Sequence, residues 1–417
     1  MTSPSSRLQP RQALVFGLVL LAVVPLEAAA PGTALWAAPA ILLAAMLIAW
    51  AAEAAQFFIA QAFALAILAW LQTMPEFAVE FVLAWKQRVD LLLANLTGAL
   101  RLLTGLGWPM IYCVAAFFHR RRYGKPMGRI RLEEQHSIEV VGLFVPLVYM
   151  GFVWWKGTLT LVDAAVLIAI YIAYLAVLRR MPAEQAEGME ELELVPRTLA
   201  QSPRRLRIFL IAAFFVGGGV LIYLTAEPFL GSLLAISALL GIPSFIFVQW
   251  VAPLVSEFPE KVSAFYWART VDRASMALMN MVSSNINQWT LLAAMLPIVY
   301  SISRGRLSMI PLNGQQELEL LMTIGQSLIG MVFLVNMELT WWEAATLFGL
   351  WGVQFGFSPV PPGPGLAGFI ATHIHRWVTA AYFAWVVIAL GRLAVGQRRL
   401  EAFRLFGEVW RRHIRGA

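Results

Sequence analysis

The sequence predicts an all-α protein that crosses a membrane about twelve times, and three observations support this prediction. Of the 417 residues, 60% are hydrophobic and 13% are charged, whereas a soluble domain carries roughly 25% charged residues. Apolar stretches of about 20 residues, the length of a membrane-spanning helix, recur from end to end. Basic residues gather in alternate loops. The composition excludes a soluble enzyme, a nucleic-acid-binding module and, with Cys113 as the single cysteine, a disulfide-rich scaffold.

The apolar stretches define the predicted spans and the division of the chain. The spans cover residues 13–30, 34–53, 57–86, 91–118, 137–155, 158–178, 207–225, 230–268, 272–303, 318–335, 338–356 and 376–394. Residues 1–33 form an extra span, or a signal-like segment, because Arg7 and Arg11 precede the apolar stretch. The expected order of units is a first five-span unit in 34–178, a polar cytoplasmic linker in 179–206, a second five-span unit in 207–356, and a further span with a basic amphipathic helix in 357–417.

The basic residues predict how the chain lies in the membrane. With the N-terminus inside, 23 of the 31 Lys and Arg residues fall in cytoplasmic segments and six fall outside, as the positive-inside rule requires. Both termini are then cytoplasmic. The excess of arginine over lysine, 27 against four, indicates a GC-rich bacterial source and therefore a bacterial inner membrane.

Two patterns lie near the C-terminus. The last segment places arginines on one helical face and apolar residues on the other, namely Leu400, Phe403, Phe406 or Gly407, Trp410 and Ile414. This arrangement predicts a basic helix on the inner leaflet or, alternatively, a solvated tail helix. His373 and His375 lie in a predicted outer loop, where histidines can sense pH but are more often incidental.

A sequence pattern occurs once in each half of the chain. Each half has Pro-Glu inside an apolar span and an asparagine in the next span; the members are Pro75, Glu76 and Asn95 in the first half and Pro259, Glu260 and Asn280 in the second. The two glutamates are 184 residues apart and the two asparagines 185. Because each half has five spans, the second copy must cross the membrane in the opposite sense. The sequence therefore predicts ten spans arranged as two inverted five-helix repeats, an architecture of secondary transporters.

The Pro-Glu pair has a specific chemical consequence inside a membrane. Pro75 and Pro259 each remove a backbone donor and break the helix, which frees carbonyl oxygens. Glu76 and Glu260 are costly to bury in lipid unless they bind an ion or a proton. Brought together by a pseudo-two-fold axis, they make an oxygen-rich site for a hard cation. Their mutual repulsion requires a proton when the site is empty. The alternative is a proline kink whose glutamate bonds a neighbouring helix.

These residues resemble the cation/calcium exchanger superfamily, which includes the membrane domain of sodium/calcium exchangers. That family carries Gly-Thr-Ser-x-Pro-Glu in each half, followed by Gly-Asn-x-x-Gly-Ser-Asn-Ile-x-Asn or Asp. Here the first motif has Thr73 in the serine position, and the second has Glu257 there. The second asparagine motif follows the family from Asn280 to Gln288, whereas the first keeps only Asn95 and the glycine three residues on. The chain is therefore identified as a divergent member.

The resemblance implies a ligand set for the transported cation. Its members are Thr73, Glu76, Asn95, Glu257, Glu260, Asn280, Ser284 and Gln288, with Glu80 added because it lies one helical turn after Glu76. The two motif glutamates are the expected metal ligands, and the two asparagines brace the broken helices or act as ligands. Ala99 and Leu103 stand where the family has oxygen ligands, which removes side-chain oxygens from one side of the site.

Two basic residues lie within predicted spans. Lys261 follows Glu260, about 100° around the helix, and Arg101 lies on the helix face opposite Asn95. Each is expected to pair with an acid or to reach toward the membrane surface. The alternative is that one of them replaces a bound cation as a fixed charge, which would describe a uniporter-like or inactive protein.

The sequence therefore predicts a secondary cation antiporter and not an enzyme. Calcium would be exchanged for sodium or protons by alternating access at the paired glutamates. No organic cofactor is expected, because the chain has no hydrolase, zinc-protease or nucleotide-binding motif. The expected partners are inorganic cations and the lipid bilayer, with no nucleic acid and no predictable protein partner. The alternatives are a sodium/proton antiporter and a non-transporting or regulatory membrane protein that keeps the exchanger fold.

Overall fold

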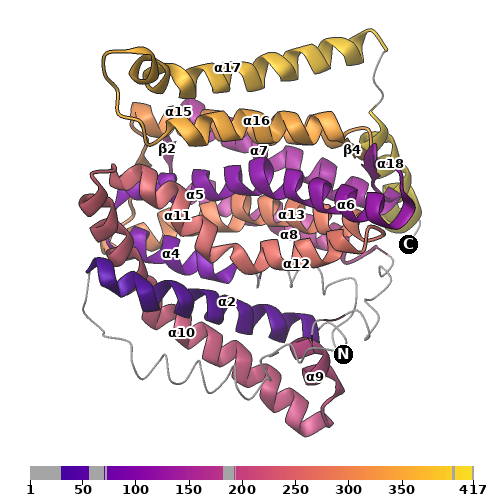
Figure 1. The fold of residues 1–417 in the computed structure, drawn as a ribbon, viewed down its shortest axis with the longest axis horizontal. Helices are drawn as coiled ribbons and strands as arrows, with labels where there is room; N and C mark the ends of the chain where they lie inside the picture. The colour runs from indigo at the N-terminus through magenta and orange to yellow at the C-terminus, as the bar shows by residue number, and fades with distance from the viewer. Residues whose placement is uncertain are drawn as a thin grey trace.

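A computed structural model describes residues 30–55, 70, 73–181, 192, 194–396 and 400–415 of the protein. The described chain is nearly all helical, as predicted, with four very short strands. Most of its helices run along one direction, and loops lie at the two ends (Figure 1). Seven of the described helices are long and apolar enough to cross a membrane. The protein is an integral membrane protein; the predicted span at 13–30 falls almost entirely outside the described residues.

The first half of the chain contains six α-helices and two of the strands within its described residues. In order these are η1 (Pro31–Thr33), α2 (Ala34–Ala55), α4 (Met74–Trp85), α5 (Val89–Leu102), the π-turn η2 (Leu103–Gly107), α6 (Trp108–Tyr123), β1 (Arg129–Arg131), η3 (Glu134–His136), α7 (Ser137–Lys156), β2 (Thr158–Leu159) and α8 (Leu161–Leu178).

The second half repeats this order. Its elements are α9 (Leu194–Gln201), α10 (Arg204–Leu240), α11 (Ser244–Ser256), α12 (Phe258–Arg269), α13 (Ala274–Asn287), the π-turn η4 (Gln288–Leu292), α14 (Ala293–Ser303), β3 (Ile310–Pro311), α15 (Gly314–Leu334), β4 (Glu338–Thr340) and α16 (Trp341–Phe357). Outside the two halves follow α17 (Leu366–Ala394), α18 (Glu401–Trp410) and η5 (Arg411–Arg415).

Corresponding elements of the two halves have matching lengths and contacts. Helices α4 and α12 each have 12 residues. Helices α5 and α13 each have 14, and a five-residue π-turn follows both. Helix α4 packs on α14 as α12 packs on α6, and α5 packs on α15 as α13 packs on α7. These correspondences are expected of two copies of one unit; the inverted orientation of the copies in the membrane stays a prediction.

The short strands join the two halves at both ends of the molecule. Strand β1 pairs with β4, placing Ile130 opposite Leu339, and β2 pairs with β3, placing Leu159 opposite Ile310. The labels of β2 and β4 mark opposite ends of the bundle in Figure 1. The sequence places the loops of β1 and β4 inside and those of β2 and β3 outside. Each pair therefore joins loops that the sequence assigns to the same side of the membrane.

Polar residues after the strands fix where three helices begin. The capping pairs are Thr160 with Asp163 at α8, Asn313 with Gln316 at α15, and Thr340 with Glu343 at α16. In each pair the two side chains accept hydrogen bonds from each other's backbone amides, which satisfies donors that the helix start leaves unpaired. Gly157 (φ 68°) ends α7 in the left-handed conformation that favours glycine.

The predicted boundary between spans 207–225 and 230–268 is wrong. Helix α10 continues through Pro228 as one helix of 37 residues, and the chain breaks only at Gly241 and again at Glu257. A proline inside a membrane helix is tolerated where neighbouring groups satisfy the freed carbonyl. At 1.5 Å per residue, α10 is about 55 Å long and exceeds the roughly 30 Å hydrocarbon core. Helix α10 also begins inside the predicted linker, 179–206.

One prediction near the C-terminus is also wrong. Helix α17 begins at Leu366, so both histidines of the expected outer loop lie on a helix. Helix α18 packs on α7; its buried residues are Ala402, Leu405 and Val409, and the ring of Phe403, on the predicted apolar face, contacts Phe144 of α7. On that predicted face Leu400 remains 44% exposed. The docking of α18 against the protein therefore decides which of its faces is buried.

Candidate cation-binding site

The two Pro-Glu motifs lie at the same place in two corresponding helices. A proline occupies the first turn of α4 and of α12, where a missing N–H costs no helical hydrogen bond. Helix α11 ends at Ser256 and α12 begins at Phe258, so Glu257 alone separates the two helices. Helix α4 begins at Met74, directly after Thr73. The acids that follow the prolines therefore lie in the first turns of two equivalent helices.

The amide of Gln288 joins carboxylates from both halves. Its Nε2 donates to Glu76 Oε2 at 2.9 Å and to Glu257 Oε1 at 2.9 Å. Gln288 begins the π-turn η4 of the second half, whereas Glu76 lies on α4 of the first. All three side chains are buried. One side-chain amide therefore holds two acids of the predicted ligand set beside each other.

A second link between the halves involves Thr73. Nδ2 of Asn287 donates to the Thr73 hydroxyl at 2.6 Å, and this hydroxyl donates to the carbonyl of Trp70 at 2.8 Å. Because Asn287 and Gln288 are adjacent, two consecutive side chains of the second half bond the start of α4. The two halves are thus joined at the predicted site itself.

The nine predicted ligands have their burial in common. All nine are buried: Thr73, Glu76, Glu80, Asn95, Glu257, Glu260, Asn280, Ser284 and Gln288. Nδ2 of Asn95 on α5 donates to Glu80 Oε1 at 3.1 Å. Glu260 lies near enough to Glu257 and Ser284 to interact with both. Asn280 lies on α13, one turn before Ser284.

Many buried oxygens on these helices have no hydrogen-bond donor. They are Glu76 Oε1, Glu80 Oε2, both carboxylate oxygens of Glu260, Asn95 Oδ1, Ser284 Oγ, Asn287 Oδ1 and Gln288 Oε1. A buried acceptor without a donor costs about 1–3 kcal/mol, and more when it is charged. Oxygens that lack donors are the ligands that hard cations such as Ca²⁺ and Na⁺ prefer. The residues at this position therefore fit a bound inorganic cation.

The carboxylates alone do not form a metal cluster. Within the described residues, no three His, Cys, Asp or Glu side chains lie close enough together to hold one metal ion. In this arrangement a cation has amide, hydroxyl and backbone oxygens beside at most two carboxylates. Ala99 and Leu103, at the positions where the resemblance implies oxygen ligands, are both fully buried and contribute no side-chain oxygen.

Lys261 lies inside the candidate site. Its Nζ is 2.6 Å from Oε2 of Glu257, one helical turn earlier, and the two side chains are only 7% and 1% exposed. Lys261 therefore pairs with an acid, and that acid belongs to the predicted ligand set. The ammonium neutralises one carboxylate beside the oxygens that lack donors.

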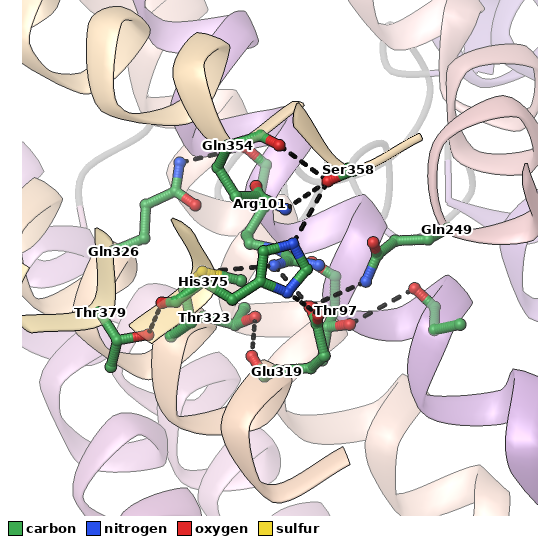
Figure 2. Close-up of polar contacts among 12 residues, drawn as sticks. Thr97, Arg101, Gln249, Glu319, Thr323, Gln326, Gln354, Ser358, His375 and Thr379 are labelled. Atoms are coloured by element: carbon green, nitrogen blue, oxygen red, sulfur yellow. Dashed lines mark hydrogen bonds and ion pairs between the residues drawn. The ribbon is translucent and has the colours of Figure 1, made fainter. Parts of the chain in front are cut away.

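Arg101 has a different environment. Its Nη1 lies 2.6 Å from Oε2 of Glu319 on α15, with both side chains fully buried. Its guanidinium lies 5.1 Å from the ring centroid of Trp250. Figure 2 shows this ion pair within a group of polar residues. Both intramembrane cations therefore pair with a buried acid, but the partner of Lys261 belongs to the predicted ligand set and the partner of Arg101 does not.

The predicted ligand set omits three polar residues that the structure places in or beside the site. Asn287 lies within the second asparagine motif, and its place in that motif could have identified it as a site residue. Glu319 and Gln249 are isolated polar residues in apolar stretches, and their contact at 2.9 Å joins positions 70 residues apart. A buried acid inside a membrane helix is itself a signal of function. The sequence spacing alone, however, does not predict which distant residues contact that acid.

Comparison with known proteins gives a family and a fold. The family model described as sodium/calcium exchanger protein matches residues 29–179 and 210–358. A crystal structure described as the H⁺/Ca²⁺ exchanger CAX is similar over 96% of this chain and 96% of its own, with 31% identity and a TM-score of 0.83.

More distant solved structures share the fold. The sodium-calcium exchanger NCX_Mj is 15% identical, with a TM-score of 0.50 over 83% of this chain and 97% of its own. YfkE is 12% identical, with a TM-score of 0.54 over 90% of this chain and 98% of its own. No curated protein sequence matches the chain.

Proposed function

We propose a function from one premise: the chain belongs to the sodium/calcium exchanger protein family. It is a membrane transporter of the cation/calcium exchanger type. Our proposal is that it exchanges calcium for protons by alternating access at a site centred on Glu76 and Glu260. The observation that carries the proposal is the set of buried oxygens without donors on corresponding helices of the two halves.

The composition of the site supports calcium as the transported ion. Calcium takes six to eight oxygen ligands in flexible geometry. Glu76 and Glu260 offer three carboxylate oxygens without donors, and the side chains of Asn95, Ser284 and Gln288 offer neutral oxygens. Such a mixture of two acids with amide and hydroxyl oxygens suits a divalent ion whose charge the two acids balance.

The charges of the site support protons as the coupling ion. Without calcium, Glu76 and Glu260 would be buried charges with unsatisfied oxygens, which costs several kcal/mol. A proton on each carboxyl removes that cost. Lys261 already neutralises Glu257. The ammonium of Lys261 therefore supplies the positive charge that a coupling metal ion would otherwise supply beside this carboxylate. The relative with 31% identity is described as a H⁺/Ca²⁺ exchanger.

The other predicted residues would orient the two glutamates. Gln288 holds Glu76 beside Glu257, and Asn95 holds Glu80. Thr73, Asn280 and Ser284 would complete the ligand shell. Helices α2 and α10, which pack together at one edge of the bundle (Figure 1), would slide past the site during transport. We further propose a bacterial inner-membrane location with both termini in the cytoplasm, and no organic cofactor.

A second candidate function is that of a regulatory membrane protein that no longer transports. The observation in its favour is the fully buried, apolar pair Ala99 and Leu103 at the positions where the resemblance implies oxygen ligands. A site with fewer oxygens on one side would bind a cation less tightly. The second half keeps its polar side chains. The two candidate functions therefore differ in whether the ligands of the second half are sufficient for cation transport.

Calcium uptake into everted membrane vesicles tests the proposal. We expect uptake driven by an imposed proton gradient, and its loss in both Glu76→Gln and Glu260→Gln. Glu227→Gln is the matched control, because Glu227 lies exposed on α10 in an ion pair with Lys86. Uptake driven only by a sodium gradient would refute proton coupling. A correctly inserted protein with no cation flux would favour the regulatory candidate.

A further inference from the structure

One buried carboxylate outside the candidate site joins four helices. Glu319 lies on α15 and is fully buried. Its Oε2 is 2.6 Å from Arg101 Nη1 on α5 and accepts from Gln249 Nε2 on α11 at 2.9 Å. Its Oε1 is 2.7 Å from Nδ1 of His375 on α17. Figure 2 shows the three side chains converging on Glu319.

The partners of Glu319 are themselves held in place. Nε of Arg101 donates to the carbonyl of Thr97 at 3.1 Å, and the Arg101 carbonyl accepts from Gln326 Nε2 at 3.3 Å. Nε2 of His375 lies 3.4 Å from the hydroxyl of Ser358, at the end of α16. The contacts therefore continue from Glu319 into α16 on one side and along α5 on the other. A buried polar network with this many connections fixes the relative positions of its helices.

Two of the joined helices also carry the candidate site. Asn95, which bonds Glu80, precedes Arg101 on α5 by six residues, or about 9 Å along the helix axis. Glu257 follows Gln249 by eight residues, at the end of α11. A Cβ atom on Gly98 would lie 1.8 Å from the Gln249 carbonyl oxygen, so the two backbones touch between these levels. The partners of Glu319 thus lie on α5, which carries Asn95 of the candidate site, and on α11, which ends directly before Glu257.

The network is one-sided, unlike the two motif glutamates. Arg101 lies six residues after Asn95, and the corresponding position after Asn280 is Ile286. Ile286 is fully buried among apolar side chains. The second half therefore has no cation at the equivalent place, and α17, which supplies His375, lies outside both halves. Because the network around Glu319 occurs on one side only, we attribute to it a role that is not part of the repeated architecture.

We propose that Glu319 is a positioning residue for the cation site. It holds α5 and α11 in the register that brings Glu80 and Asn95 of the first half opposite Glu257 and Glu260 of the second. This inference rests on the proposed function, since it assumes that those residues bind calcium. Glu319 itself touches no ion; it acts through Arg101 and Gln249. His375 extends the same support to α17.

Calcium binding by purified variants tests this role. Glu319→Gln alone leaves Arg101 as an unpaired buried charge and risks misfolding. The double variant with Arg101→Met and Glu319→Met removes both charges at similar volume, which a buried site tolerates better. We expect this variant to fold but to bind calcium at least tenfold more weakly. His375→Gln removes one of the three links and should weaken binding about threefold.

Two matched controls separate positioning from general effects. His373 lies two residues before His375 on α17, exposed, with Nδ1 2.9 Å from the carbonyl of Phe369 in its own helix. His373→Gln and Glu317→Gln on α15 should leave the calcium dissociation constant unchanged. Glu319→Asp keeps the charge on a shorter side chain that cannot reach all three partners, so it should fall between wild type and the double variant.

The possible results distinguish this inference from the proposed function. A wild-type protein that binds no calcium would refute the proposed function. A folded double variant that binds calcium like wild type would overturn the positioning role. Amide hydrogen exchange gives a readout independent of the ion: α5 and α11 should exchange faster in the double variant than in wild type, at an unchanged melting temperature. Unchanged exchange in both helices would likewise overturn the role of Glu319.

Discussion

Replacing Lys261 by methionine changes the charge of the candidate site by one unit. Lys261→Met keeps the length of the side chain and removes the ammonium that lies 2.6 Å from Glu257 Oε2. If that ammonium substitutes for a bound cation, the variant must take up another positive charge when calcium is absent. We expect a bound proton to supply it, and this proton should leave when calcium binds.

The magnitudes support this expectation. Removing one partner of a buried ion pair costs about 3–5 kcal/mol, because the other charge is left uncompensated. The pair qualifies as buried, with the two side chains 7% and 1% exposed. Protonating an ordinary glutamate at pH 7 costs about 3.7 kcal/mol. The two energies are similar, so the variant should carry the extra proton in a substantial fraction of molecules at pH 7 and in most of them at pH 6.

The assay counts protons released per calcium bound. Purified wild type and Lys261→Met are titrated with calcium in weakly buffered detergent solution at pH 6 and pH 7, with a pH indicator. At pH 6 the variant should release about one proton more per calcium than wild type. Lys261→Arg, which keeps the charge, should match wild type. Lys86→Met, which breaks an exposed ion pair with Glu227, is the surface control.

An equal proton count in wild type and Lys261→Met would refute the reasoning. It would mean either that no extra proton is bound without the ammonium or that this proton remains when calcium binds. In both cases Lys261 would not stand in for a coupling cation. A higher count in Lys86→Met would show that the assay reports global charge and not the site.

Three further outcomes follow from the packing. Gly98→Ala should lower the melting temperature sharply, because overpacking costs about 1–3 kcal/mol and the Gln249 oxygen that the new methyl group meets belongs to the backbone. Gly217→Ala should leave the melting temperature unchanged, because no atom lies within 4 Å of a Cβ placed there. Asn287→Leu removes the donor to Thr73 and should weaken calcium binding several-fold in calorimetry, with little further loss on adding Thr73→Val. Leu405→Asp should release α18 to proteolysis, whereas Leu400→Asp, on its exposed face, should not.

The architecture could be predicted because membrane burial leaves a strong pattern in a sequence. Apolar stretches predicted the all-helical membrane fold that the structure shows. The strand pairing of β1 with β4 agrees with the assignment of both loops to one side, while the count of twelve spans and the orientation stay predictions. The boundary at Pro228 could not be predicted, because the sequence near it reads as a break while neighbouring helices allow α10 to continue. The face that α18 buries depends on the surface of α7, which no local pattern encodes.

The candidate site was predictable where residues recur in a motif and unpredictable where they do not. Glu76 and Glu260 share a spacing with their asparagines, so the repeat itself singled them out as candidates. Glu319 has no counterpart of that kind, and its partners come from three other helices. Such a contact is set by how helices pack, and a lone acid in an apolar stretch does not indicate which distant residue it meets.

The pairing of the strands has a consequence for the assembly of the chain. Strand β1 pairs with β4 and β2 with β3, so each ribbon takes one strand from each half. Either half synthesised alone would hold two strands whose partners lie on the other polypeptide. The bonds from Gln288 to Glu76 and from Asn287 to Thr73 cross between the halves in the same way. Each half is therefore incomplete by itself, and the two halves must assemble with each other to complete both ribbons and the candidate site.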